Sequence, residues 1–282
     1  MLISKKDLKR FTESTVNAPH DFLGMHPVKS KGKHGVVVRA FISQVDSCEV
    51  VDLSTEDGLR YELKKIDDLG FFEGFIEGRK EVFPYRLRVR QKNQERRQFY
   101  DPYSFLPSIS ADDLYLFNEG TERRIYEKLG AHPREMDGVP GVSFAVWAPS
   151  AKRVSVVGSF NSWDGRYHPM RSLGSSGVWE IFIPGMALGE MYKFELKAQN
   201  DAIFLKTDPY GSYFEAPPNN ASIVYDNDAY EWSDGDWMAQ RQERQALDAP
   251  MSVYEVHLGS WKKRWDEDNR FLTYRELAHE LS

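Results

Sequence analysis

The stretch FLGMHP (residues 22–27) returns 106 residues later as KLGAHP (residues 128–133). Two further pairs of stretches match at nearly the same distance: GVVVRAF (residues 35–41) with GVSFAVW (residues 141–147), and DPY (residues 101–103) with DPY (residues 208–210). The distance is 106 residues for the first of these pairs and, after one inserted residue, 107 for the second. A repeat of this length is too long for a solenoid and has the size of a whole domain. The pattern therefore indicates a tandem duplication of one domain.

Each copy contains short stretches in which apolar and polar residues alternate. In the second copy the alternating apolar residues are Val142, Phe144 and Val146; Val154 and Val156; Trp179, Ile181 and Ile183; Tyr192, Phe194 and Leu196. A period of two residues is typical of strands that bury one face, and clusters of Gly, Pro and Ser separate the stretches. The spacing, about seven strands per hundred residues, is typical of an immunoglobulin-like sandwich. We therefore predict an all-β fold with two tandem immunoglobulin-like β-sandwiches.

Helices are expected to be few. Ser4, with Asp7 three residues later and an apolar pair at Leu8 and Phe11, predicts a short capped helix near the N-terminus. Residues 119–129 are expected to turn once or twice between the copies. Adjacent acidic pairs such as Asp112-Asp113 are interpreted as solvated loop residues.

Beyond the second copy the pattern changes from sheet to mixed structure. Residues 253–257 form an apolar-rich run that predicts a strand, and Thr273 with Glu276 forms a capping box before a helix. A strand followed by a helix is one unit of a (β/α)₈ barrel. We predict three parts: residues 1–118, a first sandwich that serves as a spacer or docking domain; residues 119–230, a second sandwich; and residues 231–282, a linker with the first strand and helix of a truncated barrel.

Composition and charge narrow the function classes. The net charge of −6 opposes binding to phosphate backbones, so no nucleic-acid partner is expected. The basic clusters KSKGKH (residues 29–34) and RQKNQERRQ (residues 90–98) lack interleaved aromatics and are interpreted as solvated loops. No apolar stretch has the length of a membrane span, and the start lacks the pattern of a signal peptide. Cys48 is a lone cysteine that we expect to be buried, which favours the cytoplasm.

No metal or other cofactor is expected. His26 and His132 stand in the repeated G-x-H-P motif without a second histidine or cysteine at ligand spacing. Both are interpreted as part of a turn before a strand. Glycine-rich segments lack the spacing of a phosphate-binding loop, so nucleotide-sugar chemistry gains no support.

Four motifs follow one another in the second copy: GSFNSWDG (residues 158–165), YKFEL (residues 192–196), TDPY (residues 207–210) and PPNNAS (residues 217–222). This series resembles the family 48 carbohydrate-binding modules, which are α-glucan-binding sandwiches. MSVYEVHLGSWKKR (residues 251–264) resembles the start of the catalytic barrel of glycogen branching enzymes in glycoside hydrolase family 13. The resemblance implies the N-terminal, glucan-binding part of an enzyme that cleaves an α-1,4-glucan and rejoins the piece through an α-1,6 bond in glycogen biosynthesis.

The implied partners are α-glucans, such as glycogen or amylose-type chains, and the catalytic barrel of the parent enzyme. A glucose ring has an apolar C–H face flanked by hydroxyls, which a flat aromatic surface with nearby donors and acceptors fits. Trp163 is the candidate platform, because it lies in a polar turn where a purely structural tryptophan would expose apolar area. The resemblance implies that Lys193 donates to sugar hydroxyls and that Asn219 donates and accepts there.

The series departs from the family pattern in ways that predict weak affinity. Phe204 and Leu205 stand where the family carries a second tryptophan, and Glu215 stands where it carries a leucine. Trp147 and Trp179, which lie in strand patterns, are interpreted as core residues. The first copy has DLSTEDG (residues 52–58) in place of the tryptophan loop and therefore has no stacking platform there.

Retaining glycoside transfer requires two carboxyl groups about 5 to 5.5 Å apart on a rigid frame. The resemblance places both on later barrel strands, so this chain alone is expected to be catalytically inactive. Two alternatives stay open. One is a stand-alone α-glucan-binding or regulatory module; the other is the N-terminal part of another family 13 enzyme, such as an isoamylase-type debranching enzyme or a trehalose-releasing hydrolase.

Overall fold

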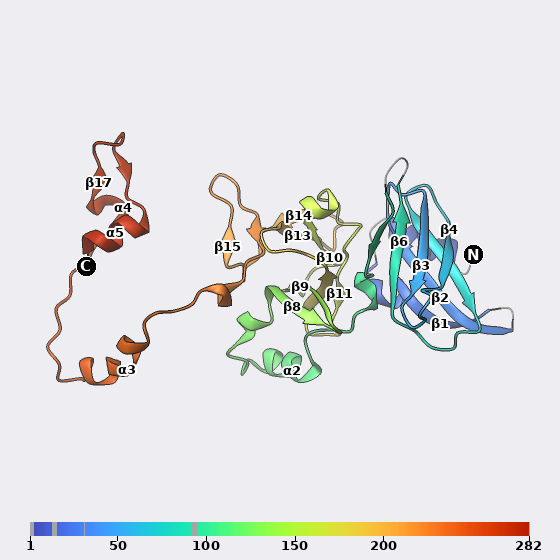
Figure 1. Ribbon diagram of the computed structural model, residues 1–282, viewed down its shortest axis with the longest axis horizontal. Helices are drawn as coiled ribbons and strands as arrows, with labels where there is room; N and C mark the ends of the chain where they lie inside the picture. Colours follow the sequence, from blue (N-terminus) through green and yellow to red (C-terminus); the bar gives the residue numbers. More distant parts are fainter. Residues whose placement is uncertain (1–2, 13–15, 31, 92–94, 282) are drawn as a thin grey trace. The chain divides into compact units, whose positions relative to one another are not determined.

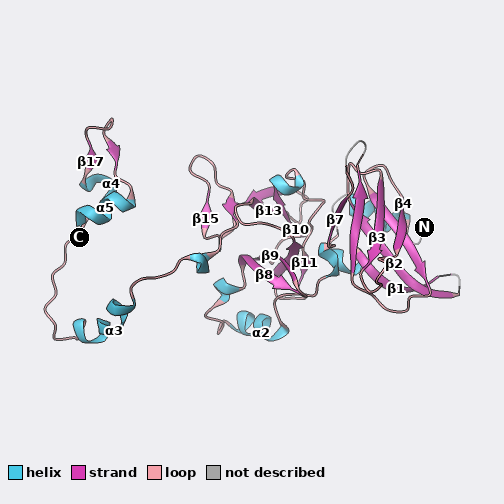
Figure 2. Ribbon diagram, in the orientation of Figure 1, coloured by secondary structure: helices cyan, strands magenta, loops and turns pink. Residues whose placement is uncertain are grey.

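The structure, a computed structural model, describes residues 3–12, 16–30, 32–91 and 95–281 (Figure 1). Among these residues the regular structure is mostly β-strand, and the helices are short (Figure 2). The chain divides into two units, Met1–Ala229 and Tyr230–Ser282. The expectation of a mostly β fold is confirmed.

The first copy forms one antiparallel sheet. Its strands are β1 (Gly24–Ser30), β2 (Lys33–Phe41), β3 (Ser47–Asp52), β4 (Arg60–Lys65), β5 (Phe71–Glu77), β6 (Tyr85–Arg90) and β7 (Arg97–Phe99). They pair in the order β1-β2-β5-β4-β3-β6-β7. One core contains Val38 of β2 and Leu87 of β6, which lie on distant strands of this order, so the sheet must curl around its own apolar face. The two halves of the predicted sandwich are thus continuous through β4, which pairs with both β3 and β5.

Cys48 lies in this core and is fully buried, as predicted. Burial, together with the nearby carboxylates of Asp101 and Glu49, raises the pKa of its thiol to about 12. The thiol therefore stays protonated at neutral pH and packs as a small apolar side chain.

The second copy forms two separate sheets. Its strands are β8 (Gly130–Met136), β9 (Val139–Trp147), β10 (Arg153–Gly158), β11 (Arg171–Ser172), β12 (Val178–Pro184), β13 (Met191–Lys197), β14 (Ile203–Lys206), β15 (Tyr213–Phe214) and β16 (Ser222–Ile223). One sheet has the order β11-β12-β9-β8; the other has the order β10-β13-β16-β15, with β14 paired to β13. Phe144 and Trp179 of the first sheet share a core with Val156 and Tyr192 of the second, which makes this copy a two-layer sandwich. The prediction that Trp179 lies in the core is confirmed.

The duplication is visible in matched buried contacts. The hydroxyl of Tyr85 donates to Asp101 at 2.7 Å in the first copy, and the hydroxyl of Tyr192 donates to Asp208 at 2.5 Å in the second. In each copy this contact joins a central strand to the repeated D-P-Y segment. A buried carboxylate requires such a partner, because its desolvation is otherwise costly.

The two G-x-H-P motifs are also equivalent in structure. Nε2 of His26 donates to the carbonyl of Leu23 at 2.7 Å, and Nε2 of His132 donates to that of Leu129 at 2.9 Å. Both histidines lie inside the first strand of their copy rather than in the turn before it. Each ring fastens the strand to the residue where the chain turns.

The helices of the structure agree only in part with those predicted from the sequence. Helix α1 (Lys5–Thr12) is confirmed, and the Ser4 hydroxyl accepts from the Asp7 amide at 3.1 Å. Helix α2 (Ala111–Glu119) was not predicted, and Asp113 is a helix-capping residue instead of a loop residue. Ser110 and Asp113 form a capping box, and Gly120 ends the helix in the left-handed region. The turn expected within residues 119–129 is present as a short 3₁₀ segment, η3 (Ile125–Glu127).

The two basic clusters lie at strand ends. The first occupies the hairpin between β1 and β2, and the second runs from the end of β6 into β7. Lys31 and residues 92–94 of these clusters lie outside the described residues.

Trp147 is exposed, and its prediction as a core residue is wrong. Its exposed fraction is 54%. Val142, Phe144 and Val146 point into the core, so the alternation of β9 turns Trp147 to the opposite face. There its indole N–H donates to the carbonyl of Ser176 at 3.2 Å.

The unit Tyr230–Ser282 contains little regular structure. Its elements are α3 (Gly235–Arg244), α4 (Leu258–Trp261), β17 (Lys263–Arg264), β18 (Arg270–Phe271) and α5 (Tyr274–Leu281). Helix α5 confirms the predicted helix, and its start is capped by Thr273, whose hydroxyl accepts from the Glu276 amide at 3.3 Å. The strand predicted at residues 253–257 is wrong, because residues 251–257 are irregular and pair with no strand in the described part of the chain. A strand needs a neighbour to satisfy its backbone groups.

Candidate functional site

The predicted sugar-binding residues gather around β13 in the second copy. Lys193 of β13 pairs with Val157 of β10, and Tyr192 pairs with Ser222 of β16. Trp163 lies in the loop that follows β10, and Asn219 lies in the segment that leads into β16. The register therefore places the two loops on either side of Lys193.

The loop after β10 is held by the side chain of Asn161, which is buried. Its amide oxygen accepts from the Gly158 N–H at 2.9 Å. Its amide nitrogen donates to the Val156 carbonyl and to Nδ1 of His168, each at 2.9 Å. One side chain thus joins the end of β10 to both the start and the end of the loop.

This clamp supports an uncommon backbone conformation. Ser162 and Trp163 have φ angles of 56° and 59°, both in the left-handed region. The Trp163 N–H donates to the Gly158 carbonyl at 2.9 Å and closes the turn. Left-handed geometry costs a residue with a Cβ about 1–2 kcal/mol. This strained backbone includes Trp163, a residue that is 37% exposed. Backbone strain at an exposed aromatic residue suggests a function.

His168 is neutral at physiological pH. Burial lowers the pKa of its imidazole to about 4. A neutral ring can accept at Nδ1, which is the contact that Asn161 makes. The protonation state of His168 is therefore coupled to the conformation of the Trp163 loop.

A buried ion pair holds the same loop at Gly165. Arg153, fully buried on β10, forms a salt bridge with Glu195 of β13. The same guanidinium donates to the Gly165 carbonyl at 2.6 Å and to the Ser155 hydroxyl at 2.9 Å. These contacts hold the end of the D-G turn against the sheet.

Lys193 is turned away from the core. Its neighbours Tyr192 and Phe194 are buried, so alternation places Lys193 on the outer face of the sheet. Its ammonium donates to the side-chain carbonyl of Asn220 at 2.5 Å. Asn219, which was predicted from the sequence, is exposed. Asn220, which positions Lys193, was not predicted. The adjacent N-N pair was the available signal.

The departures from the family pattern have structural consequences. Phe204 and Leu205 lie on the edge strand β14 and are 48% and 51% exposed. They expose apolar side-chain surface but provide no indole ring in place of the family's second tryptophan. Glu215 accepts from the Ala221 N–H at 2.9 Å, so its carboxylate braces the turn that carries the N-N pair.

The described residues contain no helix long and apolar enough to cross a lipid bilayer. Among these residues, His, Cys, Asp and Glu side chains also form no cluster of three or more that could hold a metal ion.

Two family models match this chain. Carbohydrate-binding module 48, described as the isoamylase N-terminal domain, matches residues 128–211. The N-terminal domain of alpha-1,4-glucan branching enzyme GlgB matches residues 4–103. The first copy thus matches a branching-enzyme N-terminal domain model, and the second copy matches a carbohydrate-binding-module model.

Similar proteins identify the family to which this chain belongs. The chain is 50% identical over 264 residues to 1,4-alpha-glucan branching enzyme GlgB of Rubrobacter xylanophilus and 44% identical over 280 residues to that of Cellvibrio japonicus. These alignments cover 93% and 98% of this chain and 35% and 37% of the relatives, so the chain spans about a third of their length. The chain belongs, as an N-terminal part, to the GlgB family of branching enzymes. A solved structure of pullulanase type I from Bacillus subtilis covers 75% of this chain and 28% of its own, with 18% identity and a TM-score of 0.32.

Proposed function

We propose that this chain is the glucan-binding and positioning part of a branching enzyme. The whole enzyme would act in the cytoplasm, cleaving α-1,4-glucan chains and transferring the pieces to α-1,6 positions in glycogen biosynthesis. Residues 231–282 would lead into its catalytic barrel, and residues 1–118 would act as a spacer or docking domain. The names of the relatives support the branching reaction, and the geometry around β13 supports glucan binding.

The binding site is proposed to contain Trp163, Lys193 and Asn219. The indole of Trp163 would stack on the C–H face of one glucose ring. The Lys193 ammonium and the Asn219 amide would bond the hydroxyls beside that face. The single observation that supports this role most strongly is the clamped, left-handed turn that keeps Trp163 exposed next to β13.

Glucan affinity of the Trp163→Ala variant tests the proposal. The variant is expected to migrate further than the unsubstituted chain in native gels that contain glycogen, with retention reduced a few-fold, because one aromatic contact contributes about 1–2 kcal/mol. Trp147→Ala is the matched control, since Trp147 is also a half-exposed tryptophan but lies on the opposite sheet. Equal retention of the Trp163 variant and the unsubstituted chain would rule out this site assignment.

A further inference from the structure

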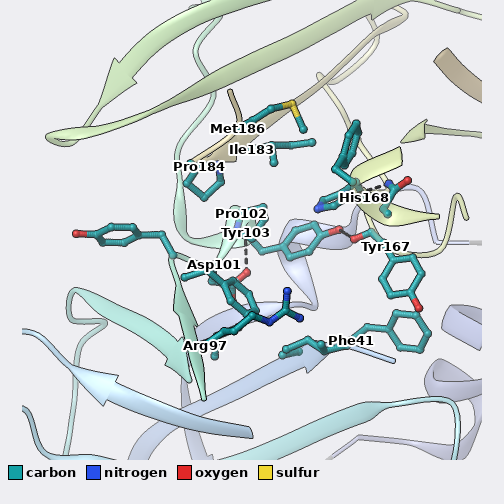
Figure 3. Close-up of a pocket in the computed structure, with 18 of the residues that line it drawn as sticks. Phe41, Arg97, Asp101, Pro102, Tyr103, Tyr167, His168, Ile183, Pro184 and Met186 are labelled. Carbon is teal, nitrogen blue, oxygen red and sulfur yellow. Dashed lines mark hydrogen bonds between the residues drawn. The ribbon is translucent and has the colours of Figure 1, made fainter. Parts of the chain in front are cut away.

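A cavity lies at the junction of the two sandwiches, within the unit Met1–Ala229 (Figure 3). Its volume is about 590 Å³. The first sandwich contributes Phe41 and Arg97 to its lining, and the second contributes Tyr167, Pro184 and Met186. The size falls in the range of pockets that take small organic ligands, about 300–1,000 Å³.

The walls of the cavity are fixed to each other by direct contacts. The hydroxyl of Tyr103 donates to the carbonyl of Tyr167 at 3.1 Å. The rings of Phe41 and Tyr167 lie 5.7 Å apart. Beside the cavity, the Arg171 guanidinium donates to the carbonyl of Phe105 at 2.9 Å. The cavity is therefore bounded by both copies at once.

Aromatic, aliphatic and polar side chains all line the cavity. Figure 3 shows Phe41 and Tyr167 on one side, Pro184 and Met186 on the opposite wall, and Tyr103 between them. Arg97 reaches toward the middle, below Tyr103. Gln98 also lines the cavity. Among the residues that the structure describes, the Arg97 side chain has no hydrogen-bond or ion-pair partner, so its five N–H donors remain available.

We propose that this junction cavity binds a short α-glucan segment, as a second glucan site separate from Trp163. The inference rests on the proposed function, since it takes the same class of ligand. Aromatic rings next to donors match the apolar face and the hydroxyls of glucose. An anionic ligand is disfavoured because Asp101 and Glu190 add carboxylates to the lining that offset the charge of Arg97.

The cavity and the Trp163 surface share one loop. Phe160, Asn161 and Ser162 line the cavity, and Trp163 follows directly in the chain. A chain segment held in the cavity would contact the inner side of this loop, while Trp163 meets sugar on the outside. Two sites on one short loop would let the second sandwich hold two parts of a branched glucan.

A methionine signal can report occupancy of the cavity itself. Met186 lines the cavity, so ¹³C-methyl labelling of methionine in the full 282-residue chain gives a local probe. Titration with maltotriose is expected to shift the Met186 methyl signal in the unsubstituted chain and equally in Trp163→Ala. Met186→Leu assigns the signal.

Two matched arginine variants make the test specific. Arg97→Ala is expected to raise the Kd for maltotriose, read from the Met186 signal, roughly tenfold, because hydrogen bonds from a charged donor are lost. Arg96→Ala removes the same charge next to Arg97, at a residue outside the cavity lining, and is expected to leave that Kd unchanged. Ala187→Trp places a bulky side chain at an exposed loop residue of the cavity lining and is expected to abolish the shift.

The outcomes separate the two proposals. A Met186 signal that does not move with maltotriose, or moves only when Trp163 is present, would overturn the cavity site and leave the Trp163 site standing. A signal that shifts with orthophosphate instead of maltotriose would also overturn it. A normal Met186 shift combined with unchanged glycogen retention of Trp163→Ala would support the cavity and remove the Trp163 assignment.

Discussion

The loops that follow β3 and β10 occupy equivalent places in the two copies but are organised by different groups. In the first copy the buried carboxylate of Asp52 accepts from the Ser54 N–H at 2.8 Å and pairs with Arg79. In the second copy the equivalent position is Gly158, where an added Cβ would lie 2.2 Å from the Met191 carbonyl oxygen. No side chain fits there, so Asn161 provides the hydrogen bonds instead.

The difference shows how one scaffold gives two surfaces. The loop of the first copy is centred on a charge that Arg79 neutralises, and no residue from 52 to 57 has a positive φ angle. Arg86, which aligns with Lys193, stacks on Tyr100 at 4.4 Å and donates to its hydroxyl at 2.8 Å. Some N–H donors of the Arg86 guanidinium are therefore already used in a contact within the chain. The loop of the second copy is centred on a neutral amide and keeps an aromatic ring exposed.

The largest expected effect comes from removing the amide clamp. Asn161→Ala leaves the Gly158 N–H and the Val156 carbonyl without their partner, and we expect the free energy of unfolding to fall by about 2–4 kcal/mol. Glycogen retention is expected to fall with it, because Trp163 loses its fixed geometry. Urea denaturation and the native glycogen gel measure the two effects.

Ser54→Ala is the control, because Ser54 aligns with Asn161 when the D-G pairs of the two loops are superimposed. Its side chain is exposed, and the cost is expected to stay below about 1 kcal/mol. Similar losses in the two variants would contradict the contrast between the loops.

A second effect depends on pH. The pKa of His168 is about 4 in the folded chain, whereas an unfolded histidine has a pKa of about 6.5. Between these values the unfolded chain binds a proton that the folded chain does not. The free energy of unfolding is therefore expected to fall on acidification, with His168 contributing about 2 kcal/mol between pH 7 and pH 5.

His168→Gln isolates this contribution, since it keeps an acceptor for Asn161 and cannot titrate. Asp101 titrates in the opposite sense, because burial raises the pKa of its carboxyl to about 6, but it does so in both proteins. Denaturation at pH 7 and pH 5 should show a smaller loss in the variant. Parallel pH curves would exclude His168 as the source.

Much of the sandwich could be predicted because its signals are local. The internal repeat showed where the two copies lie in the sequence, and the alternation in residues 142–146 identified the inward face of β9. Trp147 was predicted to be buried because it lies in a strand pattern, but it directly follows the inward-facing Val146, so the alternation places it on the opposite face. Helix α2 was missed although Ser110, Asp113 and Gly120 marked its ends, since its residues contain no strong apolar stripe. The strand predicted at residues 253–257 would need a neighbouring strand to pair with, and a local sequence pattern does not show whether that neighbour is present.

The residues of the proposed site could be named from the sequence, but the contacts that support them could not. Trp163 and Lys193 follow from recognisable motifs. The clamp by Asn161 could not be derived, because it depends on the packing of Gly158 against the neighbouring strand, a contact between distant segments. The cavity also combines residues more than a hundred positions apart, such as Phe41 and Tyr167.

The smallest expected effect tests whether an exposed aromatic ring alone is enough for glucan binding. Glu56 is exposed and aligns with Trp163 when the D-G pairs are superimposed. Glu56→Trp adds an indole to the first copy without the left-handed turn and without a counterpart of the Lys193–Asn220 pair. We expect the change to alter glycogen affinity by less than about 0.5 kcal/mol, because an unpositioned side chain loses rotamer entropy on binding that offsets the stacking gain. Clearly stronger retention of Glu56→Trp in the native gel would show that exposure, and not the clamped geometry, sets the difference between the two copies.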